Sequence, residues 1–187
     1  MYIRKAQTTD CQALMEIFQK ARQIMRASGN LHQWNDSYPS QDIILKDIDN
    51  GHCILLCEYS ETDGTETVIA TMSFIPGPDP TYAHIEQGPW DSRQSPTNGS
   101  WIDDSPYYVI HRIAVAEPGH NAAKTLLDWG FAYLEETGAG QSIRIDTHRD
   151  NVIMHHILSK YGFSLCGIIY LSSGAPRDAY QMRNSNQ

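Results

Sequence analysis

Four side chains between residues 86 and 148 are suited to moving a proton near neutral pH. His111 is the first candidate, because the ordinary pKa of an imidazole lies close to neutrality. It lies in the alternating stretch Tyr107–Val115 (YYVIHRIAV), on the same predicted face as Ile113 and Val115. A histidine at the edge of the core, hydrogen-bonded to a neighbour, is the competing interpretation. The alternative bases are Glu86, Asp146 and His148.

Aromatic and acidic side chains gather in two segments with few signals of regular structure. They are 30–40 (NLHQWNDSYPS) and the long connection 76–106. Aromatic faces and carboxylates both attract a cation, so these segments predict an amine-binding pocket. Packing of the rings over the core edge is the alternative for 30–40. The candidate substrate-binding residues from these segments are Trp34, Tyr38, Tyr82, Glu86 and Trp90. Asp146 and His148, at the end of the predicted strand at 142–147, are added to them.

The stretch AEPGHNAAK, which follows Tyr107–Val115, is typical of a backbone loop that holds a phosphate. Gly119 has no side chain, so the backbone can come close to a ligand. The amides of residues 119–123 would lie at the N-terminus of the next predicted helix, where the helix dipole favours a pyrophosphate. The same residues also fit an ordinary strand-to-helix connection.

Strands and helices alternate along the chain and would position these residues. Apolar residues at helical spacing predict two helices, one after a capping box of Thr9 with Gln12 and one after a cap at Ser40. The turn at 63–64 predicts a hairpin. The expected order is a strand at 2–6, these two helices, hairpin strands at 53–57 and 67–75, a strand at 107–115, a helix ending at Gly138, a strand at 142–147, a helix starting near Asn151, and strands at 163–171 and 178–183.

Length and composition bound the class of protein. The chain has 187 residues, of which 41% are hydrophobic and 19% charged, enough for one packed domain and short for two. We expect a single domain over 1–187, with a long loop insertion at 76–106. The formal net charge of −8 argues against a nucleic-acid partner, because duplex binding needs clustered lysine and arginine.

The N-terminal sequence MYIRKAQTTD lacks the apolar core of a signal peptide, and no apolar run approaches the roughly 20 residues that span a bilayer. We therefore expect a cytoplasmic protein with no membrane partner and with reduced thiols. His155 and His156 are adjacent on a predicted helix and point apart, so no metal site is predicted. No CxxC pair occurs among the cysteines, which we expect to be small hydrophobes: Cys11, Cys53, Cys57 and Cys166.

The strand IHRIAV is followed by a helix with TLLDW, a strand with IRIDTH, and a helix with DN at its start and YGF at its end. This order of elements resembles that of the GNAT superfamily of acyl-CoA-dependent N-acyltransferases. The resemblance covers nearly the whole chain. The segments FIPGPDPTY and GFSLCGIIYL are similar to those of uncharacterised bacterial GNAT-like proteins.

The resemblance implies an α/β (α+β) fold with a mixed, mostly antiparallel twisted sheet of about seven strands, splayed at the centre and flanked by about four helices. Acetyl-CoA would lie in the splay between Tyr107–Val115 and Ser142–Thr147. The family pattern implies a set of cofactor-binding residues, which are Ile113, Ala114, Val115, Gly119, His120, Asn121, Ala122, Ala123 and Asn151.

Two positions depart from the family pattern. Pro118 stands where the family's turn usually carries Gln or Arg, and Asn121 stands where a second Gly is usual. Asn tolerates a left-handed backbone better than most residues, so the turn can still form. Leu158 stands where many relatives have a tyrosine that acts as the acid, and Tyr161, one helical turn on, is the substitute candidate.

The implied activity is transfer of an acetyl group from acetyl-CoA to a primary amine of a small molecule or peptide by direct attack, with His111 and Tyr161 as the catalytic residues. A non-catalytic acyl-CoA-binding sensor or scaffold of the same fold is the alternative. A homodimer is kept as a candidate assembly.

Overall fold

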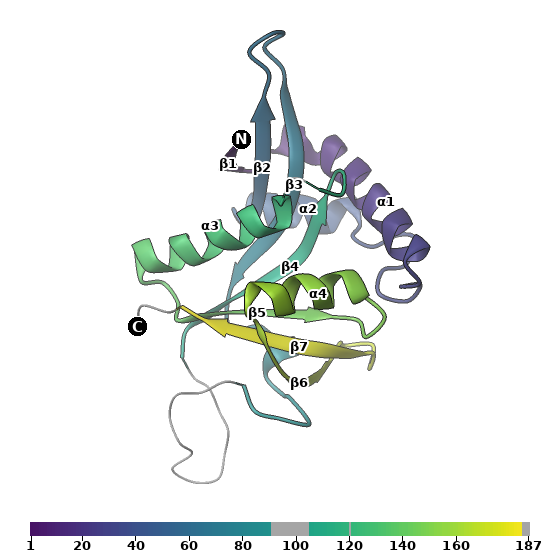
Figure 1. Cartoon of the computed structure of the whole chain (residues 1–187), viewed down its shortest axis with the longest axis vertical. Helices are drawn as coiled ribbons and strands as arrows, with labels where there is room; N and C mark the ends of the chain where they lie inside the picture. Colours follow the sequence, from purple (N-terminus) through teal and green to yellow (C-terminus); the bar gives the residue numbers. More distant parts are fainter. Residues whose placement is uncertain (91–104, 120, 185–187) are drawn as a thin grey trace. The chain divides into compact units, whose positions relative to one another are not determined.

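The computed structural model of the chain describes residues 1–90, 105–119 and 121–184. In this part of the chain, seven strands form one sheet in the order β1-β2-β3-β4-β5-β7-β6, together with four α-helices (Figure 1). The pairs β1–β2, β2–β3, β5–β7 and β6–β7 are antiparallel, whereas β4–β5 is parallel. The predicted α/β fold with a mixed, mostly antiparallel sheet is therefore confirmed.

The elements follow the predicted order closely. Their bounds are β1 Tyr2–Lys5, η1 Thr8–Asp10, α1 Cys11–Ala27, α2 Gln41–Asp49, β2 Cys53–Tyr59, β3 Glu66–Pro76, η2 Pro80–Tyr82, β4 Tyr107–Val115, α3 Ala122–Thr137, β5 Ser142–Thr147, α4 Val152–Tyr161, β6 Ser164–Tyr170 and β7 Pro176–Arg183, where η1 and η2 are short 3-10 helices.

Two compact units divide the chain. The first contains residues 1–75 and 110–130, and the second contains residues 76–109 and 131–187. The strand β4 and the helix α3 each contribute one part to both units. The described β4–β5 ladder pairs Tyr107, Tyr108 and Val109 with Ser142, Ile143 and Arg144, within the second unit. The predicted splay between these strands, and the predicted single domain, stay predictions.

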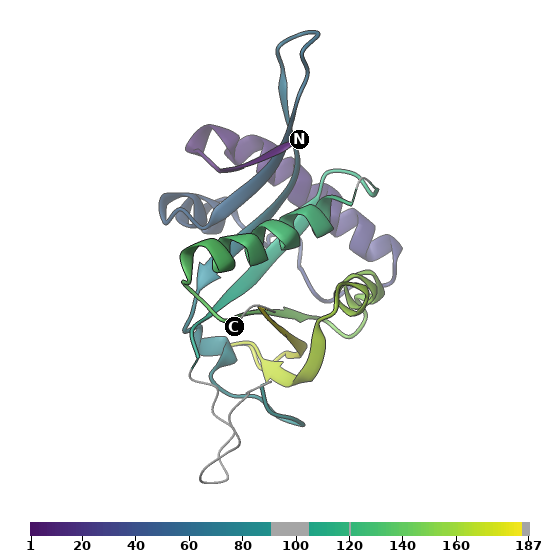
Figure 2. The same cartoon turned by 60° about the vertical axis from the view of Figure 1, so that its left-hand side comes forward.

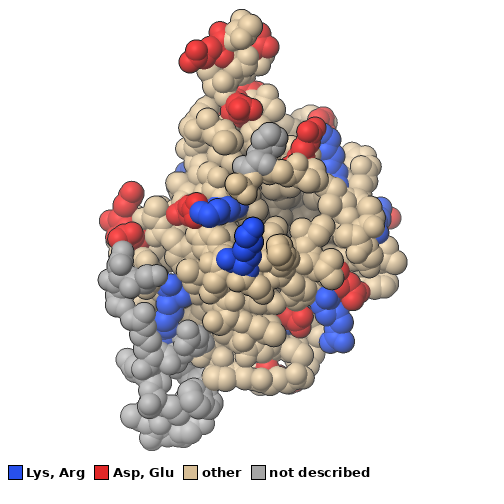
Figure 3. Space-filling view, in the orientation of Figure 1, with Lys and Arg blue, Asp and Glu red and all other residues tan. Residues whose placement is uncertain are grey.

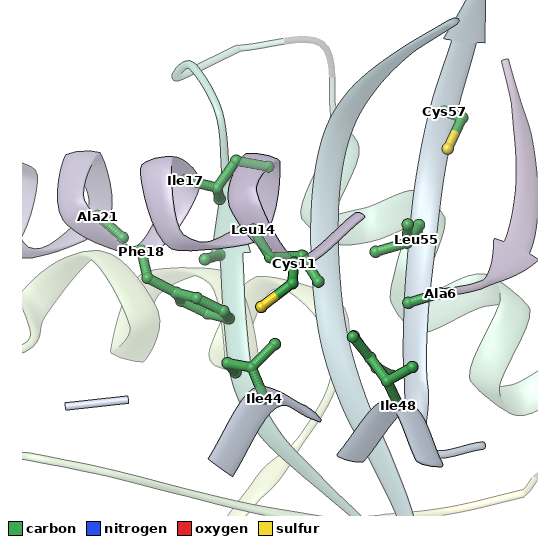
Figure 4. Close-up of a cluster of buried hydrophobic side chains, with 12 residues drawn as sticks. Ala6, Cys11, Leu14, Ile17, Phe18, Ala21, Ile44, Ile48, Leu55 and Cys57 are labelled. Atoms are coloured by element: carbon green, nitrogen blue, oxygen red, sulfur yellow. The ribbon is translucent and has the colours of Figure 1, made fainter. Parts of the chain in front are cut away.

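The core of the first unit forms between α1, α2 and β2. The apolar stripe of α1 includes Leu14, Ile17 and Phe18, all of which are buried. Figure 4 shows the Phe18 side chain directed toward that of Ile44 from α2, and the same cluster contains Leu55 from β2. The stripe recurs every three or four residues, which is why the sequence predicted this helix correctly.

The start of α1 differs from the prediction. The expected capping box of Thr9 and Gln12 was wrong, because η1 precedes α1 and places Asp10 before the helix. The Asp10 carboxylate accepts a hydrogen bond from the Gln7 backbone N–H at 2.7 Å and a forked pair from Arg4 at 2.7 and 2.8 Å. The charged hydrogen bonds between Asp10 and Arg4 of β1 are thus stronger than the hydroxyl cap that the local sequence predicted at Thr9.

The other turns agree with the sequence. The Ser40 hydroxyl accepts a hydrogen bond from the Ile43 N–H, which starts α2, and Gly138 ends α3 with a φ of 64°. Gly64 has a φ of 71° in the loop of the β2–β3 hairpin. This hairpin projects beyond the rest of its unit (Figure 2), and acidic side chains gather at its tip (Figure 3).

An unusual backbone conformation interrupts β4. Arg112 has a φ of 53°, a left-handed value that costs on the order of 1–3 kcal/mol for a residue with a side chain. Of the three non-glycine residues with positive φ in the described part of the chain, only Arg112 lies in a strand. A residue in this conformation turns the strand locally and re-aims its neighbours.

In the second unit, the β5–β7 pair is covered on both faces. The helix α4 lies over one face (Figures 1 and 2), where the His155 ring contacts the Tyr180 ring of β7. Tyr82 and Trp90, from the connection before β4, pack on the other face with Val109, Ile169 and Ala179. These two aromatic rings are therefore part of the core of this unit.

The outer strand β6 is bridged by Glu86. The Glu86 N–H donates to the Ile168 carbonyl at 2.9 Å, and the Ile168 N–H donates to the Glu86 carbonyl at 2.8 Å. Both backbones come too close for side chains, because a Cβ on Gly167 would lie 2.3 Å from the Glu86 carbonyl oxygen, and one on Gly88 would lie 2.1 Å from that of Cys166. The two glycines are required here for steric reasons.

The cysteines are free thiols. Cys11, Cys53 and Cys57 are buried, as the prediction of small hydrophobes requires, and Cys166 is partly buried. Burial raises the pKa of the Cys53 thiol to about 11, which keeps it protonated at neutral pH. Every helix in the described residues is too short or too polar to cross a membrane.

Candidate active site

The turn from β4 to α3 has the backbone that a phosphate loop needs. Gly119 has a φ of 114° and Asn121 a φ of 51°, so both residues are left-handed, a conformation that asparagine tolerates better than most residues. A Cβ added to Gly119 would meet no described atom within 4 Å beyond its chain neighbours. The Asn121 carbonyl accepts from the Thr125 N–H at 2.9 Å, which fixes the first turn of α3.

The sequence-predicted cofactor residues of this turn lie at the N-terminal end of a 16-residue helix. Gly119 and Asn121 are exposed, Ala122 is buried and Ala123 is partly buried. Helix N-terminal amides and the helix dipole attract an anion. The open position at Gly119 fits the close approach of a pyrophosphate. His120 lies outside the described residues.

The predicted catalytic base and the predicted pantetheine strand lie on either side of Arg112. His111 and Ile113 are its direct chain neighbours and are both partly buried, Ala114 is buried, and Val115 is partly buried. Ala114 packs into the core of the first unit, and the Ala116 N–H that follows donates to the Ile69 carbonyl of β3 at 2.8 Å. The strand is thus fixed on its β3 side up to the start of the turn.

The helix α4 carries the other cofactor and acid candidates. Asn151 is 6% exposed, and its side-chain oxygen accepts from the Met154 N–H at 3.1 Å, so it is the N-cap of the helix. Tyr161 stacks on Phe131 with ring centroids 5.8 Å apart, and it also contacts Phe163. Leu158, at the position of the family's tyrosine, is fully buried.

Three predicted substrate residues are brought together in the second unit. The Tyr82 hydroxyl donates to Asp146 at 2.6 Å, and Trp90 stacks on Tyr82 with centroids 5.5 Å apart. Tyr82 and Trp90 are only 1% and 4% exposed. Burial, reinforced by the Asp146 carboxylate, raises the pKa of Tyr82 well above its usual value. The Arg177 guanidinium lies 3.8 Å from the second Asp146 oxygen.

His148 belongs to a second polar group at the start of α4. Its Nδ1 accepts from the Asp150 N–H at 3.2 Å. Its carbonyl lies 3.2 Å from Nε2 of His155, whose Nδ1 is 2.6 Å from the Tyr180 hydroxyl. Since a carbonyl can only accept, the His155 Nε2 carries a proton in this contact. Burial, followed by the charge of Asp178, raises the pKa of Tyr180.

The remaining predicted substrate residues lie in different environments. Trp34 and Tyr38 contact each other, with centroids 5.8 Å apart, and Trp34 also packs on Phe18 at 5.9 Å. Glu86 is exposed, and its carboxylate accepts from the Tyr170 hydroxyl at 3.0 Å. The structure therefore groups Trp34 with Tyr38, and Tyr82 and Trp90 with Asp146.

Sequence reasoning missed three arginines with little exposure, which are Arg112, Arg144 and Arg177. Arg112 pairs with Asp47, 65 residues away, at 2.7 Å. The Arg144 side chain, 2% exposed, lies between the rings of Trp90 and Tyr107, with its guanidinium carbon 4.2 and 3.8 Å from their centroids. The sequence feature that could have revealed them is an arginine within an apolar strand pattern, because a buried arginine needs a polar or aromatic partner.

In the described residues, no group of three or more His, Cys, Asp or Glu side chains is arranged to hold a metal ion. What the site offers is a left-handed glycine turn at a helix N-terminus, preceded by a strand with a histidine. This combination is typical of α/β proteins that bind a phosphate-bearing ligand.

Solved structures identify the family. A GNAT-family acetyltransferase from Streptococcus agalactiae is 31% identical to this chain, with a TM-score of 0.77, and the match covers 97% of this chain and 94% of that one. The chain belongs to the GNAT family of acetyltransferases. No protein-family model matches it, and no curated protein does.

More distant structures share the fold. A ribosomal-protein-alanine N-acetyltransferase from Brucella melitensis is 17% identical, with a TM-score of 0.61 and coverage of 98% of this chain and 99% of that one. A proposed acetyltransferase from Salmonella typhimurium, solved with its cofactor acetyl-CoA, is 16% identical, with a TM-score of 0.58 and coverage of 100% and 95%.

Proposed function

We propose that this protein is an N-acetyltransferase that transfers an acetyl group from acetyl-CoA to a primary amine of a small molecule or peptide. Membership of the family supports acetyl transfer, and the relative solved with acetyl-CoA supports this donor. The observation that carries the proposal is the turn before α3, where Gly119 and Asn121 are both left-handed and Gly119 faces open space.

In the proposed complex the backbone of residues 119–123 holds the pyrophosphate, and the β4 backbone at Ile113, Ala114 and Val115 aligns the pantetheine arm. Asn151, at the start of α4, is a further cofactor contact. Acetyl-CoA supplies the acetyl group as a thioester. The Val115 N–H is the candidate donor to the oxygen that gains negative charge during attack.

The acceptor must react as a neutral amine. An alkyl amine has a pKa of about 10.4, so the neutral form at pH 7 costs about 4.6 kcal/mol. His111 accepts the proton that the amine loses, and Tyr161 donates a proton to the leaving sulfur. Trp34 and Tyr38 are proposed to contact the amine substrate, since their loop carries aromatic faces that attract a cation.

A glycine comparison tests the donor site. Gly119→Ala forces a side chain onto a φ of 114°, so we expect the turn to change and the affinity for CoA to fall at least tenfold, about 1.4 kcal/mol. Gly29→Ala is the matched control, because Gly29 also has a positive φ (88°) and open surroundings, at the end of α1. Calorimetric titration with CoA measures both. Equal affinities for the two variants and the parent would remove the turn from the site.

A turnover assay distinguishes the proposed enzyme from the non-catalytic alternative. The purified protein is mixed with acetyl-CoA and a panel of amines, and release of free CoA thiol is followed. Thermal stabilisation by CoA with no thiol release for any amine would favour an acyl-CoA sensor or scaffold. Neither stabilisation nor release would exclude both functions.

A further inference from the structure

The left-handed residue of β4 is held by a buried polar cluster. The Arg112 Nε donates to Asp47 Oδ2 at 2.8 Å and to Ser73 Oγ at 3.1 Å, and its Nη1 donates to the Tyr38 hydroxyl at 3.1 Å. Its Nη2 lies 2.7 Å from the same Asp47 oxygen. We call Arg112, Asp47, Ser73 and Tyr38 the Arg112 clamp.

The members of the clamp come from four parts of the first unit. Asp47 lies on α2, Ser73 on β3, Arg112 on β4, and Tyr38 in the α1–α2 connection. The Ser73 hydroxyl also donates to Asp47 at 2.6 Å, so one carboxylate oxygen receives the guanidinium and the hydroxyl together. The side chains of Arg112 and Asp47 are 11% and 8% exposed. A planar fork in such a buried site has one orientation that satisfies its partners.

Tyr38 is itself fixed on two further sides. Its carbonyl accepts from Arg22 Nη1 at 3.0 Å, and its ring contacts the Trp34 ring. The clamp therefore does not rest on a freely moving loop. It joins the segment proposed to contact the amine with the strand proposed to hold acetyl-CoA.

The clamp acts where the chemistry is proposed to take place. His111, the proposed base, directly precedes Arg112, and Ile113, the first proposed cofactor residue, directly follows it. Because φ at Arg112 is a rotation of the main chain between these neighbours, its value sets the direction of the His111 side chain relative to the Ile113 N–H. A fully extended residue at position 112 would change that direction.

We propose that Arg112 is a positioning residue: the Arg112 clamp holds the left-handed backbone of β4, and this backbone orients His111 and the Ile113 amide for acetyl transfer. The inference rests on the proposed function for its kinetic part. Its structural part, that the guanidinium cluster maintains the backbone conformation, is independent of any ligand. The contacts of Arg112 with Asp47 on α2 and Ser73 on β3 thus determine the backbone conformation of β4.

A pair of double variants tests this idea. Arg112→Gly with Asp47→Asn and Arg112→Ala with Asp47→Asn both remove the ion pair without leaving a buried charge. They differ in one respect, because glycine adopts a positive φ readily and alanine resists it. The matched control is Arg4→Ala with Asp10→Asn, which removes another arginine–aspartate pair of the same unit, between β1 and η1.

Two measurements are made on folded protein, with melting checked first. We expect amide hydrogen exchange of residues 110–115 to be at least tenfold faster in the alanine double variant than in the glycine one. We also expect kcat to fall at least tenfold in the alanine variant and to recover largely in the glycine variant, while the control keeps the parent's kcat. Should the alanine variant melt below the assay temperature, Tyr38→Phe replaces it in the hydrogen-exchange measurement alone, because Tyr38 is also proposed to contact the amine, and Tyr2→Phe is its control.

Equal exchange and equal kcat in the two double variants would overturn the proposal, since position 112 would then not act through its backbone. If the parent protein neither binds CoA nor releases thiol, the proposed function fails. Hydrogen exchange still decides the structural part in that case, so the two failures are distinguishable.

Discussion

At the scale of single residues, Asn121 and Arg112 both have a left-handed backbone conformation, and each does so for a different reason. Asn121 is one of the few non-glycine types that tolerates this conformation, so its own chemistry made the turn predictable from sequence. Arg112 has no such tolerance. Its conformation depends on Asp47, which lies 65 residues earlier, and no local pattern could reveal that partner.

His111 gives the sharpest test at this scale. His111→Ala removes the proposed base, so we expect kcat to fall about 10²- to 10⁴-fold and the acidic limb of the pH profile of kcat/KM to disappear. Steady-state kinetics over pH 5 to 9, roughly the range around an imidazole pKa, measure this. His156→Ala is the control, because His156 is exposed on α4 and has no proposed role. An unchanged profile in the His111 variant would assign the base elsewhere.

At the scale of elements, helix and strand ends were largely predictable, because they depend on residues close in sequence. Ser40, Gly138 and Asn151 act at the positions that their types suggested. The start of α1 was wrong since Asp10 is bound by Arg4, a contact between elements. The burial of Tyr82 and Trp90 was likewise not predictable from the sequence. Their segment has no regular spacing of apolar residues, and its packing depends on β5 and β7.

Asn151, the N-cap of α4, has a capping role and a proposed role in cofactor binding, and one substitution can separate the two. Asn151→Asp keeps an oxygen that can accept from the Met154 N–H, and a negative charge there suits the helix dipole. It also removes an N–H donor and adds a charge that repels phosphate groups. We expect the melting temperature to be maintained while the KM for acetyl-CoA rises about tenfold.

Ser40→Asp is the control for this variant, since it makes the same kind of change at the N-cap of α2. Thermal melting and steady-state kinetics are compared for both variants. A KM unchanged by Asn151→Asp would limit Asn151 to the capping contact that the structure describes.

At the scale of the whole molecule, the chain is acidic, with a net charge of −8, and divides into two compact units. Its stability should depend on the carboxylates that are held in charged form. The hydrogen bonds from Arg4, together with the Gln7 N–H, keep the pKa of Asp10 below its ordinary value, although partial burial acts in the opposite direction. Asp10 is thus an acidic residue whose protonation is expected to reduce stability in acid.

Because the folded-state pKa of Asp10 is lowered, its contribution is present above the unfolded pKa of about 3.9 and is lost as pH falls through the lower folded value. We expect Asp10→Asn to reduce the free energy of unfolding by about 1–2 kcal/mol at pH 7, with the difference shrinking below about pH 4. Urea denaturation from pH 7 to pH 3 measures this. Asp36→Asn is the control, because Asp36 is 88% exposed in its pair with Arg26 and such pairs contribute little. A difference that stays constant with pH would contradict the assignment.

The bridge between Glu86 and Ile168 also has a consequence for assembly. A sheet grows when a strand from another molecule pairs with open backbone groups at its border. At the middle of β6 those groups are already taken by the chain's own residues, at a spacing that only Gly88 and Gly167 permit. Recruitment of a further copy by strand addition is therefore closed at this point, and a homodimer would have to use another surface.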